Sequence, residues 1–393
     1  MNPSYHTYWR ELASGTRCGL ADRLLTLLLA PFSLMYSLVL GQRAALYDFG
    51  VLKTHRLPRP VVSIGNITVG GTGKTPVTAY IARFLLAAGY RVAVLSRGYG
   101  GSLEGQTSVV SDGATIMMSA GECGDEPYLL ASTVPGLMVV IGTDRCAAGQ
   151  LALTQLSPDV FLLDDGYQHL RLHRDLNILL LDFSRPFGNC WTLPAGMLRE
   201  PSTATGRADL IIMTRASEGV TITTDTRGIP ACVSRHTIVD LLPLGNRSPV
   251  PFSHCKDKKV LAFAGIADPD SFFEGLRAKE LNLVSCLRFP DHVVYNKERC
   301  DEIADAKKRS GADFLITTEK DGVKLKGLSQ ELATRTLFAR LELKIENPEL
   351  LEGLLMALPK QTQPPPNPSF VRRGVCNSSP PVSGGAGGGK VSA

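Results

Sequence analysis

The stretch that decides the fold is Val61-Val-Ser-Ile-Gly-Asn-Ile-Thr-Val-Gly-Gly-Thr-Gly-Lys-Thr-Pro76. It runs from a short apolar strand into a glycine-rich turn and then into a segment with helical periodicity. Glycines let the turn backbone curl so that its N–H groups point at phosphate oxygens, and the helix start adds a partial positive charge. Lys74 is placed to reach the β- and γ-phosphates, and the Thr75 hydroxyl suits Mg²⁺. The stretch therefore predicts a loop that binds nucleotide phosphates.

This loop departs from the strict pattern G-x-x-x-x-G-K-[ST], because Thr68 occupies the first glycine position. Val69 stands where a related variant loop has lysine. An ordinary glycine-rich turn is the competing interpretation, and the strand–turn–helix context argues against it. The residues that we predict to bind the nucleotide are Thr68, Val69, Gly70, Gly71, Thr72, Gly73, Lys74 and Thr75.

The sequence around the loop alternates between short apolar runs and helical patterns, which predicts a buried, mostly parallel sheet with helices on both faces. The fold class is thus α/β and P-loop NTPase-like. A second, smaller α/β series begins near residue 216. Expected strands cover 61–64, 91–95, 137–141, 160–163, 178–181, 210–213, 260–263, 282–288, 314–317 and 337–341, and expected helices 77–88, 271–278, 297–308 and 348–357.

The length of 393 residues suits two domains with additional segments. We predict an N-terminal helical segment at 1–59, a P-loop core domain at 60–215, a second α/β domain at 216–360 and a disordered Pro/Gly-rich tail at 361–393. Of the net charge of +5, residues 1–60 carry +4 and residues 361–393 carry +3, so the middle is −2. This distribution argues against a nucleic-acid binder.

Residues 24–40 form an uncharged run near the basic N-terminus. As a helix the run would be about 26 Å long, slightly short for a bilayer core of about 30 Å. A weak polar stripe passes through it, and Pro31 is expected to kink it. An interfacial helix on a membrane surface is the favoured interpretation, ahead of a short span and of a buried core helix.

Acidic residues follow a second expected strand at 160–163, where Asp164 and Asp165 come directly after the apolar run. In P-loop enzymes an aspartate at this place holds Mg²⁺, whereas the competing interpretation is a turn or helix cap. The polar residues Gln168 and His169 follow at the carboxyl end of the strand, where such folds bind ligands. Asp125, just before Pro127, is equally well explained as a helix start. A lone histidine such as His292 is more often structural than catalytic.

Taken together, the motifs resemble the tetraacyldisaccharide 4'-kinases of lipid A synthesis. The matching segments, in unbroken order, are GNITVGGTGKTP (65–76), LSRGYGG (95–101), GDEP (124–127), DVFLLDDGYQH (159–169), PAGMLREP (194–201), FAGIADPDSFF (263–273), FPDH (289–292) and TTEKD (317–321).

The resemblance implies transfer of the ATP γ-phosphate to the 4'-hydroxyl of a tetraacylated glucosamine disaccharide 1-phosphate, with Mg²⁺ held by Thr75, Asp164 and Asp165. It further implies that Asp125 is the base, that His292 orients it and that Lys74 serves the nucleotide. Additional groups of the site, with less defined roles, would be Arg97, Tyr99, Gln168, His169, Arg199 and Glu200. The expected setting is the cytoplasmic face of the bacterial inner membrane, with a glycolipid substrate and a monomeric, peripheral or monotopic chain.

Two other functions compete with this interpretation. A membrane-associated P-loop GTPase or switch NTPase would share the phosphate loop, and Thr318-Glu-Lys-Asp321 superficially resembles a guanine signature without its asparagine. A non-enzymatic membrane scaffold would carry a degenerate loop, which the intact Lys74 and Thr75 argue against.

Overall fold

Two long antiparallel strands, β8 (Ala231–Pro243) and β12 (Thr336–Glu346), join the two halves of the fold. The structure is a computed structural model that describes residues 3–216, 219–220, 226–244, 248–325 and 330–359. Within this described part, twelve strands form a single sheet in the order β10-β9-β11-β12-β8-β7-β6-β1-β5-β2-β4-β3. The predicted tail at 361–393 lies outside the described residues.

The first half-sheet comprises β3 to β7 with β1 and β2, and it is parallel except for β3. Apart from the edge strand β3, its strands are short and largely buried, because helices cover both faces of a parallel sheet. Its strands are β1 (Val61–Gly65), β2 (Val92–Ser96), β3 (Ser108–Asp112), β4 (Met138–Ile141), β5 (Val160–Asp164), β6 (Leu176–Asp182) and β7 (Leu210–Thr214).

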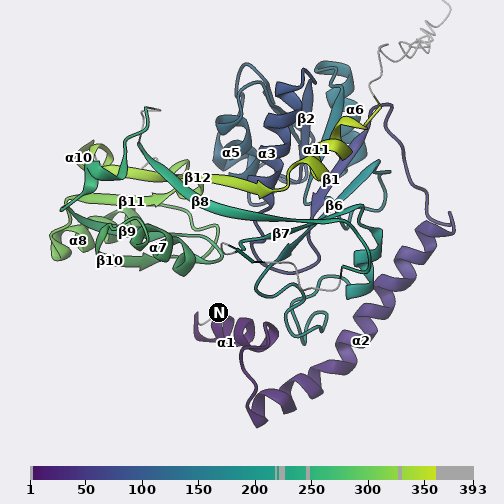
Figure 1. The fold of residues 1–393 in the computed structure, drawn as a ribbon, viewed down its shortest axis with the longest axis horizontal. Helices are drawn as coiled ribbons and strands as arrows, with labels where there is room; N and C mark the ends of the chain where they lie inside the picture. Colours follow the sequence, from purple (N-terminus) through teal and green to yellow (C-terminus); the bar gives the residue numbers. More distant parts are fainter. Residues whose placement is uncertain (1–2, 217–218, 221–225, 245–247, 326–329, 360–393) are drawn as a thin grey trace, which may run out of the picture. The chain divides into compact units, whose positions relative to one another are not determined.

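The second half-sheet is parallel within itself and consists of β9 (Lys259–Ala264), β10 (Asn282–Arg288), β11 (Phe314–Thr318) and β12. β7 pairs only with the first residues of β8, so β8 extends about 30 Å beyond it before β12 returns alongside. The carboxyl ends of the two half-sheets therefore face each other (Figure 1).

Helices cover both faces of the first half-sheet. Leu162 on β5 packs in the cluster that contains α3 and α5, whereas its neighbours Phe161 and Leu163 pack in the cluster that contains α6. The helices of the described core are α3 (Lys74–Ala87), α4 (Ala120–Cys123), α5 (Asp125–Thr133), α6 (Arg145–Gln155), α7 (Pro269–Arg277), α8 (Lys297–Ser310), α9 (Glu319–Gly322), α10 (Gln330–Thr334) and α11 (Glu349–Met356), with 3₁₀ turns at Ser202–Arg207 and Phe252–Cys255.

The predicted fold class is confirmed, including the mostly parallel sheet flanked by helices and the apolar N-terminal helix. Ten of the strands lie where short apolar runs predict them. The sequence patterns do not predict β3 or β8, because β3 is a short edge strand and β8 carries polar residues at its centre. The proposed domain boundary at residue 215 stays a prediction, since β8 and β12 continue one sheet across it.

The N-terminal segment forms α1 (Pro3–Ala13) and the long helix α2 (Leu20–Asp48). α2 continues through Pro31, and its apolar side chains are largely exposed, which argues against a buried core helix. The predicted polar stripe faces the protein: Ser33 is fully buried and Ser37 shares a hydrogen bond with Thr192. α1 reaches both halves, because Trp9 donates to the carbonyl of Pro194 and Arg10 to that of Ala267.

Replacing Ser33 tests how α2 is attached. The Ser33 hydroxyl donates to the carbonyl oxygen of Thr192 at 2.8 Å and accepts from the N–H of Ala195 at 2.9 Å. Ser33→Ala leaves the buried N–H of Ala195 without its acceptor, whereas the Thr192 carbonyl keeps the N–H of Gly196 at 3.0 Å. We therefore expect a loss of about 1–3 kcal/mol in unfolding free energy. Denaturation in detergent micelles, with the exposed Leu34→Ala as control, measures it. Equal stabilities of the two variants would contradict this attachment.

Candidate active site

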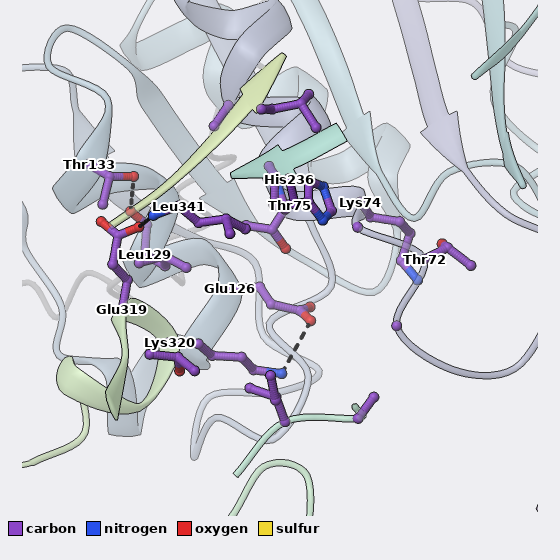
Figure 2. A pocket seen from close by; sticks show the side chains of 18 of the residues that line it. Thr72, Lys74, Thr75, Glu126, Leu129, Thr133, His236, Glu319, Lys320 and Leu341 are labelled. Carbon is purple, nitrogen blue, oxygen red and sulfur yellow. Dashed lines mark hydrogen bonds and ion pairs between the residues drawn. The ribbon is translucent and has the colours of Figure 1, made fainter. Parts of the chain in front are cut away.

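A cleft of about 1900 Å³ opens between the carboxyl ends of the two half-sheets. One wall holds the phosphate loop and the ends of β2 and β5, and the other holds the segments that follow β9, β10 and β11. Figure 2 shows Glu126 from the first half paired with Lys320 from the second, and Lys74 and Thr75 on the phosphate-loop side of the same cleft. Because ligands of open α/β sheets bind outside the carboxyl ends of strands, this position is the expected one for a site.

The phosphate loop joins β1 to α3, in the predicted order of strand, turn and helix. Gly73 caps α3 with a left-handed backbone (φ 76°), which turns the chain into the helix at Lys74. The Lys74 ammonium lies 3.6 Å from Oδ1 of Asp165 and 3.5 Å from Oδ1 of Asn66. Its charge is therefore held at the phosphate-binding wall by neighbours on the same loop and on the end of β5. Residues 69–75 line the cleft, whereas Thr68 is buried beside Leu198.

The paired aspartates have opposite electrostatic environments. Burial, together with the negative charges of Glu126 and Asp165, raises the pKa of Asp164. Burial acts in the same direction on Asp165, but Lys74 and then Arg199 outweigh it and lower the pKa of Asp165. Arg199 donates to Oδ2 of Asp165 at 3.0 Å. A cation brought to this pair would replace the burial penalty on Asp164 with an attractive interaction.

Asp125 and His292 meet across the two halves. Asp125 begins α5, and His292 follows β10 with a left-handed backbone (φ 59°). Nδ1 of His292 lies 3.3 Å from Oδ2 of Asp125, and its ring stacks edge-on against Tyr99 at 5.6 Å. Burial would raise the pKa of Asp125, but the hydrogen bond with His292 and the nearby lysines outweigh this and lower it. The carboxylate is thus charged and partly shielded from solvent.

The remaining predicted residues divide into two groups. Arg97, Tyr99, Gln168, His169 and Arg199 line the cleft, and their contacts with the substrate stay a prediction. Glu200 is buried away from the cleft and forms an ion pair with Arg207. Burial, followed by the charge of Arg145, lowers the pKa of His169 to about 4, so this imidazole is neutral.

His236 is a cleft residue that the sequence patterns do not single out, because it lies on the unpredicted strand β8. A Cβ atom at Gly73 would approach Cε1 of His236 to 2.6 Å. Burial, then the charge of Arg215, lowers the pKa of His236 to about 4, so a neutral ring packs against the loop. The second set of missed residues, Lys320 and Lys324, is signalled only by the charged TTEKD segment and its continuation.

Oxygen donors for a hard divalent cation lie together beside the loop. The Thr75 hydroxyl and the carboxylates of Asp164 and Asp165 line the same cleft. Among the residues that the structure describes, no donor bonds to the buried Oδ1 of Asp165, which lies 3.6 Å from the Lys74 ammonium. Such oxygen ligands suit Mg²⁺. Asp144, Cys146 and His169 also lie within 4.8 Å of one another, but Arg145 and Arg171 beside them oppose a cation.

Comparisons with known proteins point to one family. The family model described as tetraacyldisaccharide-1-P 4'-kinase matches residues 25–359. Tetraacyldisaccharide 4'-kinase from Pelobacter propionicus is 62% identical over 358 residues, which is 91% of this chain and 99% of that protein. The corresponding protein of Geobacter sulfurreducens is 54% identical over 318 residues, 81% of this chain and 89% of that protein.

Among solved structures, LpxK from Aquifex aeolicus, described as an "apo" form in complex with ATP, has a TM-score of 0.71 and 37% identity. The alignment covers 84% of this chain and 98% of that one. Fold, phosphate loop and acidic strand end together define a P-loop kinase. More particularly, the chain belongs to the tetraacyldisaccharide 4'-kinase family. The competing GTPase and scaffold interpretations receive no support from these matches.

Gly73→Ala tests the fit between the loop and His236. The added Cβ would collide with the imidazole, and the left-handed backbone disfavours any side chain at this position. We expect ATP affinity to fall at least about tenfold, or about 1.4 kcal/mol, by calorimetric titration. Gly206→Ala, which meets no atom within 4 Å, is the matched control. Unchanged affinity in Gly73→Ala would show that the loop does not need this contact.

Proposed function

We propose that the chain transfers the γ-phosphate of ATP to the 4'-hydroxyl of a tetraacylated glucosamine disaccharide 1-phosphate, giving a lipid A precursor. Membership of the kinase family supports the reaction class and the substrate. The observation that carries the mechanism is the Asp125–His292 pair, which forms between the two half-sheets at the edge of the cleft. The phosphate loop on one side and this pair on the other suit a nucleotide and an alcohol acceptor.

In the proposed reaction Asp125 accepts the proton of the acceptor hydroxyl, and the oxygen of that hydroxyl bonds to the γ-phosphorus. The bond from that phosphorus to the bridging oxygen breaks, and ADP leaves. Phosphoryl transfer depends on positioning and charge stabilisation more than on covalent catalysis. Lys74 and Arg199, which both line the cleft, would supply the positive charge. His292 orients Asp125, and Tyr99 supports the His292 ring.

Mg²⁺ is the cofactor that we propose beside ATP. Thr75, Asp164 and Asp165 would hold it, and when bound it would neutralise charge on the nucleotide phosphates. Asp164 is fixed in place by the Thr78 hydroxyl, which donates to its Oδ1 at 3.3 Å. Asp165 is fixed by Arg199 and by the Lys74 charge, so both carboxylates are oriented before the metal arrives.

We further propose that α2 binds the cytoplasmic face of the bacterial inner membrane as an interfacial helix of a monomeric chain. α2 is long and apolar enough to cross a membrane by composition, with 11% of its most apolar window buried. Its middle, however, is hydrogen-bonded through Ser33 and Ser37 to the loop at Thr192–Ala195. A spanning α2 would carry that irregular backbone into the hydrocarbon, which is unfavourable. An interfacial position avoids this cost.

A transfer assay tests the reaction. With radiolabelled ATP and the lipid disaccharide in mixed micelles, we expect Lys74→Ala to abolish labelling and Asp125→Asn to lower turnover by about 10²–10⁴-fold. His292→Ala should lower it less, because the base remains. The exposed Asp257→Asn is the control. Equal labelling by wild type and Lys74→Ala would overturn the kinase, and wild-type turnover in both Asp125→Asn and His292→Ala would overturn the base.

The interfacial helix predicts weaker membrane binding when its outer face becomes polar. Leu28, Phe32 and Met35 are all more than half exposed on that face. Their joint replacement by glutamine should lower sedimentation with anionic phospholipid vesicles at least about tenfold, since each apolar side chain contributes about 1.5–3 kcal/mol when buried. Met117→Gln, at an exposed site elsewhere, should bind like wild type. Undiminished binding of the triple variant would exclude α2 as the contact.

A further inference from the structure

The Asp125 carboxylate has a second partner from the opposite half of the fold. Nζ of Lys324 lies 3.4 Å from Oδ2 of Asp125, the same oxygen that faces Nδ1 of His292. Lys324 comes just after α9, and its side chain is only 8% exposed. A buried ammonium is costly unless it is paired, so its location beside Asp125 has to be stabilised by the surrounding protein.

That stabilisation comes from the second half-sheet itself. Nζ of Lys324 lies 3.3 Å from Oδ1 of Asp321, whose side chain is completely buried. Oδ2 of Asp321 accepts from the N–H of Gly265 at 2.9 Å and from the Thr318 hydroxyl at 2.8 Å. The ring of Tyr295 lies 5.6 Å from the same ammonium. Lys324 is therefore anchored at the ends of β9 and β11, independently of Asp125.

We propose that Lys324 is a positioning residue for the phosphoryl transfer, whose anchored ammonium holds the Asp125 carboxylate in its charged form and in contact with His292. This inference rests on the proposed role of Asp125 as the base. It adds a specific device: the charge that favours ionised Asp125 belongs to the other half of the fold, and Asp321 keeps it there. The base is thus fully prepared only where the two halves meet.

The physical need for Lys324 follows from the burial of Asp125. Burial favours the neutral acid, which cannot accept a proton. An opposite charge within about 4–6 Å has the contrary effect, and it lowers the pKa of a carboxyl group by roughly one to three units. His292 and Lys324 both contact Oδ2. In the described part of the chain, Lys324 is the lysine whose ammonium lies within 4 Å of Asp125, and Lys320 acts from farther away.

The other charged groups around the pair are already engaged. Lys320 lies 3.1 Å from Asp291, 3.8 Å from Glu126 and 3.4 Å from Nε2 of His292. Its charge is thus shared between two acids, neither of which is the base. The Tyr99 ring covers His292, and the remaining acid that faces Lys324 is Asp321. Removing Lys324 would therefore leave Asp125 with His292 and a distant, shared ammonium.

The test compares pH profiles of kcat/KM for phosphoryl transfer in mixed micelles at constant ionic strength. Without the ammonium the folded-state pKa of Asp125 rises. As the pH falls, the base is therefore protonated earlier, at a higher pH than in wild type. We expect the acid limb of Lys324→Met to lie about one pH unit above that of wild type, with activity recovering as the pH rises above that limb. Titration of the substrate phosphates is common to all variants and cancels in this comparison.

Two further variants separate the charge effect from damage to the fold. Lys324→Met alone leaves Asp321 buried without its counter-ion, so the double variant Lys324→Met/Asp321→Asn removes both charges and should show the same upward shift. Asp321→Asn alone keeps the Lys324 ammonium beside Asp125. The acid limb of this variant should therefore not move to higher pH. A purely structural role would affect the single variants alike. Lys256→Met, at an exposed lysine, controls for the loss of one positive charge.

The outcomes are distinct. An acid limb of the double variant that coincides with wild type, while Asp125→Asn remains inactive, would overturn the role of Lys324 and leave the base in place. Wild-type activity of Asp125→Asn would overturn the proposed base, and this inference with it. A raised limb in both variants that lack Lys324, and not in Asp321→Asn or Lys256→Met, would establish the proposal.

Discussion

The antiparallel pairing of β8 with β12 is the interaction on which the rest of the structure depends. Apart from the edge strand β3, each half-sheet is parallel, and a parallel sheet presents its loops for ligand binding at its carboxyl edge. Because β12 runs against β8, the second half-sheet points its carboxyl edge back toward the first. Both sets of loops consequently line one cleft, and residues from distant parts of the sequence can act on the same substrates.

The charges in this cleft follow from that arrangement. The nucleotide side has Lys74 and Arg199 around Asp165, all carried by the first half. The acceptor side depends on both halves, since Asp125 comes from the first and its close cationic partners from the second. In the proposed assignment, the phosphate loop and its charged neighbours come from one half of the protein, whereas preparation of the base needs both halves. A base that is prepared only where both halves meet suits a kinase that must avoid transfer of the phosphate to water.

Much of the fold could be predicted because buried parallel strands are short and apolar on both faces. The run at 160–164 and the glycine-rich loop at 61–76 are of this kind, and they locate half of the site. β8 could not be predicted in this way, since Arg235, His236 and Thr237 interrupt any apolar pattern. Their placement depends on pairing with β12, about a hundred residues away in the sequence.

The proposed acceptor side of the site follows from the sequence only through the family resemblance. Spacing alone leaves Asp125 indistinguishable from a helix start, and it does begin α5. His292 becomes informative when the sheet brings it 3.3 Å from Asp125. The sequence signal for Lys324 is weak, because it only continues the charged TTEKD segment and a lysine near an acidic turn is common. Glu200 shows the converse, as a motif residue that the fold commits to an ion pair with Arg207.

The way α2 is attached has a consequence for how the protein would find its substrate. Hydrogen bonds from the helix centre tie the body of the protein to one side of α2, while apolar side chains cover the other. A protein held to a bilayer in this way searches a surface instead of a volume. Its encounter rate would then follow the density of glycolipid within the leaflet. ATP would reach the cleft from solution, because the cleft would lie outside the hydrocarbon.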